Sequence, residues 1–398
     1  MYRWFIVAIA TIALAVGSVV TYGMGTIAAF YQVDWQLTQF QTGFISTMTN
    51  VGPLCSMMIF GHLMDRYGEK YVIGLSALLL GLTAALLPFA SSYTTLLIGV
   101  FIVGLFYGSA QTGGSTVITK WFPNEHRGLA MGIRQTGLPI GGALAASILP
   151  AVYFQYSIDA THYTQAIIAI SGALLFLAIY KDPSSNAVLT KDTTSFRHKL
   201  HAIKNNRRLY PLYMIGGVMV SFQMIIPAHY VSFLHHREHL PLQQAGFLLS
   251  LAMVGGVIGR IALAAISDRF FATRRFFLFV ITLLVTGCFI IVFPLMIHQA
   301  FWLFSSYSFI LGFFAFGWYS LYIVSISEQA DKHIIGLTIS TALTINQFFI
   351  IAAPALFGLF VDWSGQFIVC FVALGALMLI LAAWQLLRTI FNKKTRST

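Results

Sequence analysis

The sequence predicts an all-α, polytopic membrane protein with twelve transmembrane helices in two six-helix bundles. Hydrophobic residues make up 58% of its 398 residues and charged residues only 9%, whereas soluble domains carry about 25% charged residues. Apolar stretches of about 20 residues, enough to cross a bilayer, recur along the whole chain. The connections between them are short, with one exception near the middle.

Twelve stretches reach membrane-spanning length. They are predicted over 4–30, 43–63, 71–90, 94–118, 128–153, 163–181, 210–234, 244–267, 275–297, 301–326, 334–361 and 366–390. The first is longer than the apolar core of a signal peptide, about 7–15 residues, so we expect it to be a retained helix. The predicted organisation is an N-terminal bundle over 1–181, a basic linker over 182–209, and a C-terminal bundle with a short basic tail over 210–398.

The basic residues predict the orientation. Of the 23 Lys and Arg, all but Arg134, Arg237 and Arg260 fall on one side of the predicted membrane, and positive charge marks the cytoplasmic side. We therefore expect both termini and the linker in the cytoplasm and the protein in the cytoplasmic (inner or plasma) membrane. Topology thus explains the net charge of +11, and no soluble basic face is left for nucleic acid. Three scattered cysteines form neither a disulfide framework nor a metal site, and no cofactor is expected.

A short motif follows the second span and returns after the eighth. Residues 61–68 read Gly-His-Leu-Met-Asp-Arg-Tyr-Gly, and the Asp-Arg pair recurs at Asp268 and Arg269. The repeat indicates a parallel duplication of six helices. The motif and the 6+6 layout resemble the major facilitator superfamily over the whole chain. The resemblance implies two bundles around a central cavity, alternating access by rocking, and substrate binding near the midplane.

The charged residues of this motif are gating candidates. The resemblance implies that Asp65, and with an incomplete motif Asp268, belongs to a cytoplasmic latch that holds the outward-facing state. An Asp at a helix exit can accept hydrogen bonds from a neighbouring helix N-terminus and lie in its dipole field. Arg66 and Arg269 can pair across the loops, and Arg127 completes the gating set. Ordinary topogenic charge is the alternative interpretation.

Two arginines, Arg134 and Arg260, stand inside apolar spans that contain no Asp, Glu or Lys. Such an arginine costs about 2.5–3.5 kcal/mol at a helix centre. Counted from Arg127 and Asp268, they lie roughly 10 and 12 Å deep at 1.5 Å per residue. In the superfamily the fifth and eighth spans face each other, so both cations could approach one anion. Arginine binds carboxylates bidentately and keeps its charge. Snorkelling and hydrogen bonds to backbone carbonyls are the alternatives.

The segment Gly255–Arg260 resembles the eighth span of the oxalate/formate exchanger and monocarboxylate transporter branch. There an arginine in this span binds the substrate carboxylate, which the resemblance implies for Arg260. The exchanger's second cation, a lysine in the eleventh span, is absent, and Asn346 and Gln347 are the polar residues of that span. Arg134 is the candidate for the second charge.

Other polar residues within spans are further substrate-binding candidates. His229 could donate to a substrate or carry a proton, and a structural hydrogen bond is the alternative. Tyr22, Gln111, Tyr319 and Asn346 lie on helices that line the cavity in the superfamily. They would orient a ligand without adding charge, and helix packing is the alternative for each.

Pro139 is expected to free a backbone carbonyl and to kink the fifth span. The run Gly137–Pro139 loosely resembles the antiporter motif of drug exporters but lacks its Gly-Pro pair. The exporters also carry an arginine in the fourth span, where this chain has Phe101. Both departures count against a proton-driven drug exporter.

The sequence therefore predicts a secondary active transporter of a small organic anion, such as a mono- or dicarboxylate, working as an antiporter or symporter. Its partners are the anionic substrate, the lipid bilayer, and protons or a counter-anion, and we expect a monomer. A multidrug or metabolite exporter of the same superfamily is the alternative. An enzyme is not expected, because the spans offer no convergent acid, base or nucleophile cluster.

Overall fold

The structure is a computed structural model of the chain and describes residues 2–122, 124–182, 196–238, 240–272, 274–293, 300–331 and 334–394. Within these ranges, the side chains of Asp65 and Arg127 lie outside what the structure describes. Twelve helical stretches of the described part are long and apolar enough to cross a membrane. The predicted all-α class and the predicted number of spans are confirmed.

The elements follow one another as a series of helices. They are α1 (Tyr2–Thr21), α2 (Gly23–Trp35), α3 (Gln39–Tyr67), α4 (Glu69–Leu86), the short 3₁₀ helix η1 (Leu87–Phe89), α5 (Tyr93–Trp121), α6 (Asn124–Gln135), α7 (Gly137–Gln155), α8 (Ile158–Ile179), α9 (Phe196–Asn205), α10 (Tyr210–Glu238), α11 (Leu242–Phe270), α12 (Arg275–Val292), α13 (Phe301–Gly317), α14 (Tyr319–Gln329), α15 (Ile335–Ser364) and α16 (Phe367–Lys394).

Three spans are each interrupted at one residue. The first is divided at Tyr22 into α1 and α2, the fifth at Thr136 into α6 and α7, and the tenth at Trp318 into α13 and α14. All three residues keep right-handed helical dihedral angles. The interruptions therefore alter the hydrogen bonding locally while each span continues across the membrane.

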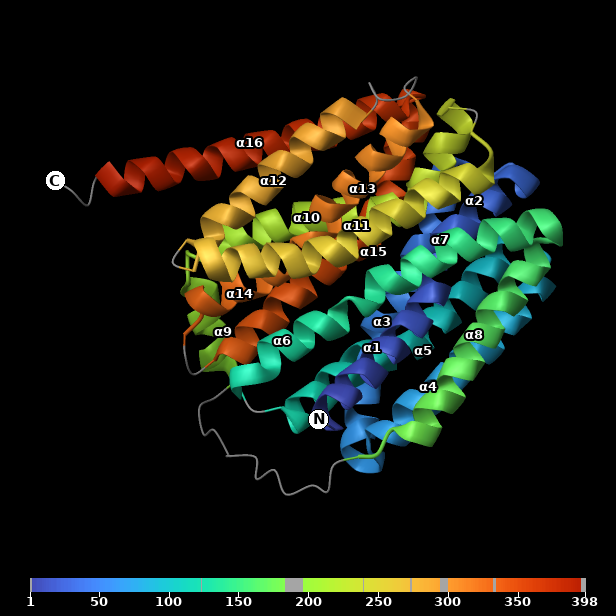
Figure 1. The fold of residues 1–398 in the computed structure, drawn as a ribbon, viewed down its shortest axis with the longest axis horizontal. Helices are drawn as coiled ribbons and strands as arrows, with labels where there is room; N and C mark the ends of the chain where they lie inside the picture. The colour runs from blue at the N-terminus through green and yellow to red at the C-terminus, as the bar shows by residue number, and fades with distance from the viewer. Residues whose placement is uncertain are drawn as a thin grey trace.

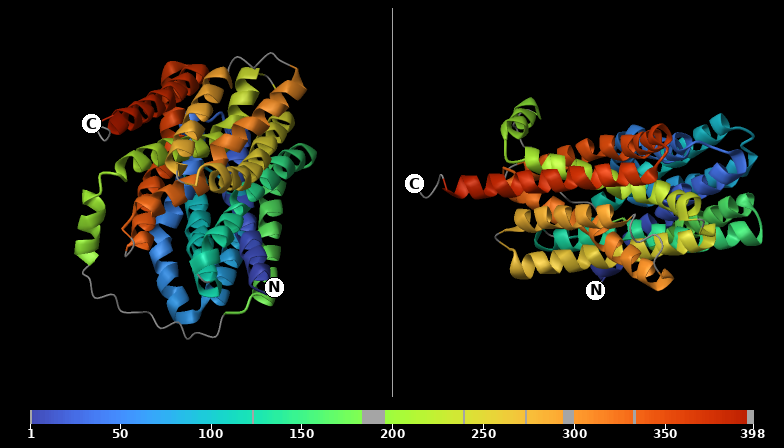
Figure 2. Two further views of the ribbon diagram at one scale, coloured as in Figure 1. Left: turned by 60° about the vertical axis from the view of Figure 1, so that its left-hand side comes forward. Right: turned by 90° about the horizontal axis from the view of Figure 1, so that it is seen from above.

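The helices form two bundles that lie side by side (Figure 1), α1–α8 at the N-terminal side and α10–α16 at the C-terminal side. The start of α1, the end of α16 and the α9 segment lie toward one end of the molecule, which we call the linker face (Figure 1). The opposite end, where α2 meets α3 and α15 meets α16, is the distal face. Figure 2 shows α9 standing apart from the main bundles, at the level of the linker face.

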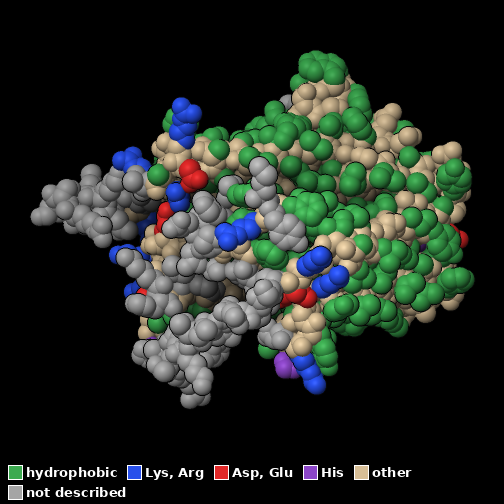
Figure 3. Space-filling model, turned by 60° about the horizontal axis from the view of Figure 1, so that its bottom comes forward, with side chains coloured by type: hydrophobic (Ala, Val, Ile, Leu, Met, Phe, Trp, Pro, Cys, Tyr) green, Lys and Arg blue, Asp and Glu red, His purple; other side chains and the backbone are tan. Residues whose placement is uncertain are grey.

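Side chains sort by polarity over the surface. In Figure 3 the Lys and Arg side chains gather toward one end, while hydrophobic side chains cover most of the other part of that face. Large apolar residues are widely exposed, among them Met58 at 87% and Ile380 at 68%. Trp302 and Trp363 are also exposed, at 70% and 85%, and both lie near helix ends, as interfacial aromatic residues do. The chain is an integral, multi-pass membrane protein.

Polar contacts join the two bundles on the distal side. The Asp362 carboxylate on α15 accepts hydrogen bonds from the backbone N–H groups of Gln39 (2.9 Å) and Phe40 (2.7 Å). These are the first residues of α3, whose N-terminal N–H groups have no partner within the helix. Nearby, the Ser232 hydroxyl of α10 contacts the side-chain oxygens of Gln32 and Gln39. An acid of one bundle therefore caps a helix of the other.

Glycines bring the backbones of the two bundles close together along the same boundary, which we call the distal seam. A Cβ on Gly25 would lie 2.0 Å from the Pro227 carbonyl oxygen, and one on Gly43 would lie 2.2 Å from the Pro354 oxygen. Gly358 meets the Gln39 carbonyl oxygen in the same way, at 2.1 Å. Such distances leave no room for any larger residue. The bundles are thus closely packed on the distal side.

Candidate functional site

The three interrupted spans meet in the centre of the molecule. Tyr22, at the junction of α1 and α2, interacts with Gln223 of α10 in the other bundle. The Gln223 side-chain oxygen also accepts a hydrogen bond from the indole N–H of Trp318, at 3.0 Å. Trp318 is the junction between α13 and α14. One buried glutamine therefore links two of the helix interruptions across the bundle boundary.

Arg260 lies in α11 and is 4% exposed. Its Nε donates to the Phe316 carbonyl of α13 at 3.0 Å, and its Nη1 donates to the Gln135 carbonyl in the opposite bundle. Its guanidinium carbon lies 5.5 Å from the ring centre of Tyr319, over the ring face. Among the described residues, its Nη2 is buried without a hydrogen-bond partner. The side chain is therefore held in place on three sides while keeping donor capacity.

The Gln135 carbonyl is available because of Pro139. A helix pairs each carbonyl with the N–H four residues later, and proline has no N–H. The carbonyl of Gln135 thus loses its normal donor, and α6 ends there. The sequence-based prediction that Pro139 frees a carbonyl identifies this atom, and its partner is Arg260.

Arg134 lies in the last turn of α6 and is 1% exposed. Its Nη2 donates to the carbonyls of Ala110 (2.7 Å) and Gln111 (3.0 Å) on α5. Gly114, one turn further along α5, leaves the space that the guanidinium fills, since a Cβ there would lie 2.2 Å from its Nε. Arg134 thus binds backbone carbonyls of its own bundle. Such hydrogen bonds were the alternative to substrate binding in the sequence-based prediction.

The two arginines share aromatic neighbours. Arg134 and Arg260 both interact electrostatically with Tyr107 of α5 and Tyr319 of α14, and Arg260 also interacts with Tyr22. The arginines come from different bundles, and so do the tyrosines. The five residues form what we call the central cluster, which joins two permanent cations with three phenol groups.

The other predicted binding residues lie next to this cluster or apart from it. Gln111 supplies a carbonyl to Arg134, and its side chain interacts with Tyr107. Asn346 is 2% exposed and accepts a hydrogen bond from Tyr322 at 3.3 Å, with its Nδ2 buried and lacking a hydrogen-bond partner. Asn346 therefore contacts Tyr322, which lies about one helical turn from Tyr319 on α14, inside the C-terminal bundle.

His229 does not join the central cluster. It is fully buried, and its Nε2 donates to the Pro354 carbonyl of α15 at 2.8 Å. Its ring lies beside Phe357, and Gly43 of the N-terminal bundle approaches its Nε2. Six residues separate it from Gln223, roughly 9 Å along a helix. His229 therefore lies where the two bundles meet on the distal side. Its bond to Pro354 is the structural hydrogen bond that was the alternative to a role in substrate or proton binding.

The described gating residues lie on the linker face. Arg66 and Arg269 each extend over the adjacent aromatic ring, Tyr67 and Phe270, at 5.2 and 5.5 Å from the ring centre. Asp268 forms a 2.8 Å ion pair with Arg275. In the described part, Arg66 and Arg269 therefore contact aromatic rings of their own helices.

Arg275 extends the Asp268 contact to a third helix, because it also reaches Glu328 at 3.2 Å. In the N-terminal bundle the Lys70 N–H donates to Asp182 at 3.1 Å, which gives the start of α4 an acidic neighbour. The side chains of Asp65 and Arg127 fall outside the described part, so their predicted roles stay predictions.

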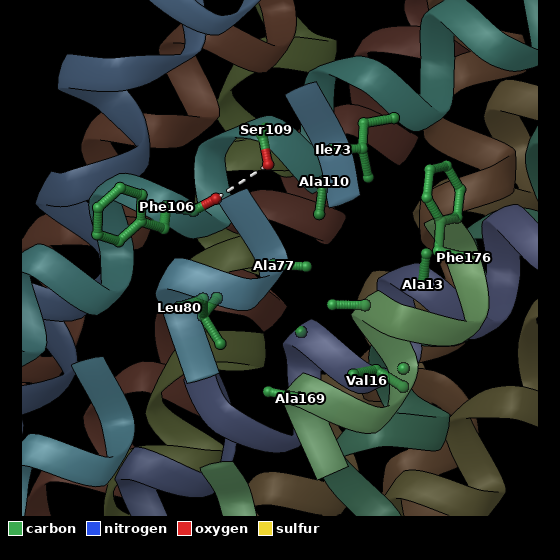
Figure 4. Close-up of a pocket in the computed structure, with 13 residues that line it drawn as sticks. Ala13, Val16, Ile73, Ala77, Leu80, Phe106, Ser109, Ala110, Ala169 and Phe176 are labelled. Carbon is green, nitrogen blue, oxygen red and sulfur yellow. Dashed lines mark hydrogen bonds between the residues drawn. The ribbon is translucent and has the colours of Figure 1, made fainter. Parts of the chain in front are cut away.

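A small cavity lies within the N-terminal bundle, and one of its lining residues, Ala110, also supplies a carbonyl to Arg134. It holds about 20 Å³ and is lined by side chains of α1, α4, α5 and α8. Figure 4 shows that these are almost all apolar, such as Ala77 and Ala169, and that the one hydroxyl, of Ser109, turns back to the Phe106 carbonyl. A polar solute needs several polar partners, so this cavity is a packing gap.

Sequence reasoning missed several residues of the site. Gln223 and Trp318 bind each other across the core of the C-terminal bundle, and Ser320 donates to the Arg260 carbonyl at 3.2 Å. Gln223 carried a usable signal, since it is a polar residue in an otherwise apolar stretch of the seventh span. Trp318 carried none, because a tryptophan in a span is usually an ordinary packing residue.

The family model described as Major Facilitator Superfamily matches residues 5–354. The chain belongs to this superfamily. The relatives of this chain carry transporter names, so the chain is a transporter and not an enzyme.

Three curated relatives illustrate the range of similarity. An uncharacterised transporter of this superfamily from Mycobacterium tuberculosis is 26% identical over 229 residues, covering 57% of this chain and 50% of the relative. The 4-hydroxybenzoate transporter PcaK of Acinetobacter baylyi is 25% identical, covering 38% and 34%. A probable nitrate/nitrite antiporter of Thermus thermophilus is 27% identical, covering 66% and 61%. The matches thus span about a third to three fifths of these relatives.

A solved structure shows the same fold over the whole chain. A bacterial homologue of the human lysosomal transporter Spinster, in an inward-facing and occupied conformation, has a TM-score of 0.75. The match covers 98% of this chain and 97% of that one at 14% sequence identity. At this identity the likeness concerns the fold alone.

Proposed function

We propose that this transporter carries a small organic anion, with a carboxylate as the charged group, and that Arg134 and Arg260 bind it between the bundles. The observation that carries the proposal is the state of Arg260. Its charge is buried, no described carboxylate pairs with it, and its Nη2 has no hydrogen-bond partner. A buried cation is stabilised by an opposite charge that also completes its hydrogen bonds.

The central cluster suits such a ligand in shape and chemistry. Arginine presents two parallel donors that match a carboxylate, and the phenol groups of Tyr22, Tyr107 and Tyr319 can donate hydrogen bonds without adding charge. The names of two relatives agree with the proposal, since 4-hydroxybenzoate and nitrate are both anions. The branch that exchanges oxalate and formate remains one proposal within this class.

The structure has its distal side closed, which suits alternating access. Substrate would compete with the Gln135 carbonyl for Arg260, and binding would neutralise the buried charge before the bundles rock. We propose that the linker face is cytoplasmic, in agreement with its Lys and Arg. We also propose that the bundle boundary at residues 182–209 is the connection about which the halves move.

The test is a thermal-shift screen of purified protein against a panel of mono- and dicarboxylates, followed by uptake into proteoliposomes. We expect at least one carboxylate to stabilise the wild type and to lose its effect in Arg260→Ala and Arg134→Ala. Arg208→Ala is the matched control, because it also removes an arginine, at an exposed position on the linker face. Stabilisation that survives both central substitutions would refute the proposed site, and stabilisation by lipophilic cations alone would favour the exporter alternative.

A further inference from the structure

A second cationic site lies on the linker face, far from the central cluster in the chain and in the fold. An open surface cavity of about 670 Å³ lies there between α9, the start of α10 and the end of α16, and its five described lining residues are all exposed. Its lining contains three cations from three segments, Lys204, Arg207 and Arg388, together with Asn205 and Tyr210. Among the described residues, none of those that line it is acidic.

The cavity has a fixed frame. Ile203, one residue before Lys204, is 5% exposed and packs into the core of the bundle. Asn206 donates through Nδ2 to the Gln329 carbonyl at the end of α14, at 2.7 Å. The Tyr210 hydroxyl donates to the Lys204 carbonyl at 2.8 Å. These contacts fasten the backbone between Ile203 and Tyr210 to the C-terminal bundle, while the Lys204 and Arg207 side chains stay exposed.

The cavity lies at the level where the membrane-spanning segments end. Tyr210 is the first residue of the seventh span, and Arg388 is the last residue of the twelfth. The Arg388 guanidinium lies over the Trp384 ring, 5.8 Å from its centre. Trp384 and Leu387 on the same helix are 46% and 54% exposed, next to the apolar surface of α16. The cations thus stand directly beside a surface that acyl chains would cover.

We propose that this cavity binds the phosphate headgroup of an anionic phospholipid in the leaflet on the linker face. Arginine binds phosphate bidentately and lysine binds it as a point charge. Basic pockets between transmembrane helices are suited to such headgroups, and a tryptophan at this depth contacts the interfacial region. A bound lipid would bridge α9 to α16 and hold the linker helix against the C-terminal bundle.

The experiment compares lipids on the purified full chain in detergent. Native mass spectrometry counts bound lipids and a thermal melt measures stability, with dioleoyl phosphatidylglycerol, dioleoyl phosphatidylcholine or inorganic phosphate added. We expect phosphatidylglycerol to remain bound and to raise the Tm, and the other two to do neither. Each basic residue near an anionic surface strengthens binding about fivefold, so losing all three weakens it roughly 100-fold.

The variant Lys204→Gln/Arg207→Gln/Arg388→Gln is therefore expected to lose the bound phosphatidylglycerol. Arg208→Gln is the matched control, because it removes an exposed neighbouring cation that does not line the cavity, and it should retain the lipid. If the triple variant does not fold, Arg388→Gln alone should show the loss at about fivefold. Retention by the variants equal to the wild type, or equal stabilisation by inorganic phosphate, would overturn the proposal.

Discussion

Replacing Pro139 with alanine returns a hydrogen-bond donor to position 139. The new N–H can bond the Gln135 carbonyl within the helix, which removes that carbonyl from Arg260. A hydrogen bond to a charged group contributes about 1.5–3 kcal/mol, equivalent to about 10- to 150-fold in affinity. The substrate would no longer displace this contact. We therefore expect Pro139→Ala to bind the carboxylate at least about tenfold more tightly than the wild type does. The expected figure stands at the low end of the range because part of the free energy goes into straightening the helix.

The assay is isothermal titration calorimetry with a carboxylate identified by the thermal-shift screen. Pro150→Ala is the matched control, because Pro150 is also inside α7 and its substitution restores a donor to a carbonyl that Arg260 does not contact. It should leave the affinity unchanged. Wild-type affinity in Pro139→Ala, or an equal gain in both variants, would refute the idea that the Gln135 carbonyl competes with substrate.

Other predictions concern the seam and the central cluster. Asp362→Asn should weaken the cap on α3 by about 1 kcal/mol. The rate at which a thiol reagent labels a cysteine placed at the distal seam should then rise about fivefold. Asp34→Asn, whose partner Tyr153 is in the same bundle, should not change it. Gly25→Ala would set a Cβ 2.0 Å from a carbonyl of the opposite bundle, so uptake should fall at least about tenfold with little change in Tm. Gly312→Ala clashes at 1.8 Å within one bundle and should lower the Tm instead; the reverse pattern would contradict the assignment of the seam. Tyr319→Leu removes a cation–π contact of about 0.5–2 kcal/mol and should weaken carboxylate binding about 2- to 30-fold, whereas Tyr319→Phe keeps the ring, loses only the hydroxyl, and should weaken binding less in the same titration.

Hydropathy and length predicted the twelve spans, because a bilayer sets the length of every helix that crosses it. The interruptions at Tyr22 and Trp318 were not predicted. Neither residue breaks a helix by itself, and both keep helical dihedral angles. Their positions depend on what packs around them, as with the bond from Trp318 to Gln223.

For the candidate site, the residue types could be predicted but not their partners. Pro139 had to free the carbonyl of Gln135 by its covalent structure, yet the pairing of Gln135 with Arg260 joins residues 125 positions apart. The direction in which a buried polar residue points depends on the rotation of its helix against its neighbours. His229 shows this, because the sequence places it in the right span while the packing places it at the distal seam beside Pro354.

The glycine approaches at the seam have a kinetic consequence. Gly25, Gly43 and Gly358 each bring the backbone of one bundle close to a carbonyl oxygen of the other, and a Cα–H···O contact at such a place contributes only about 0.5–1 kcal/mol. Three of them together hold about 1.5–3 kcal/mol, and no side chain has to change its rotamer for them to separate. Once the two hydrogen bonds of Asp362 to α3 have broken, the halves can separate at these three positions in small steps, on the microsecond-to-millisecond scale of collective domain motion.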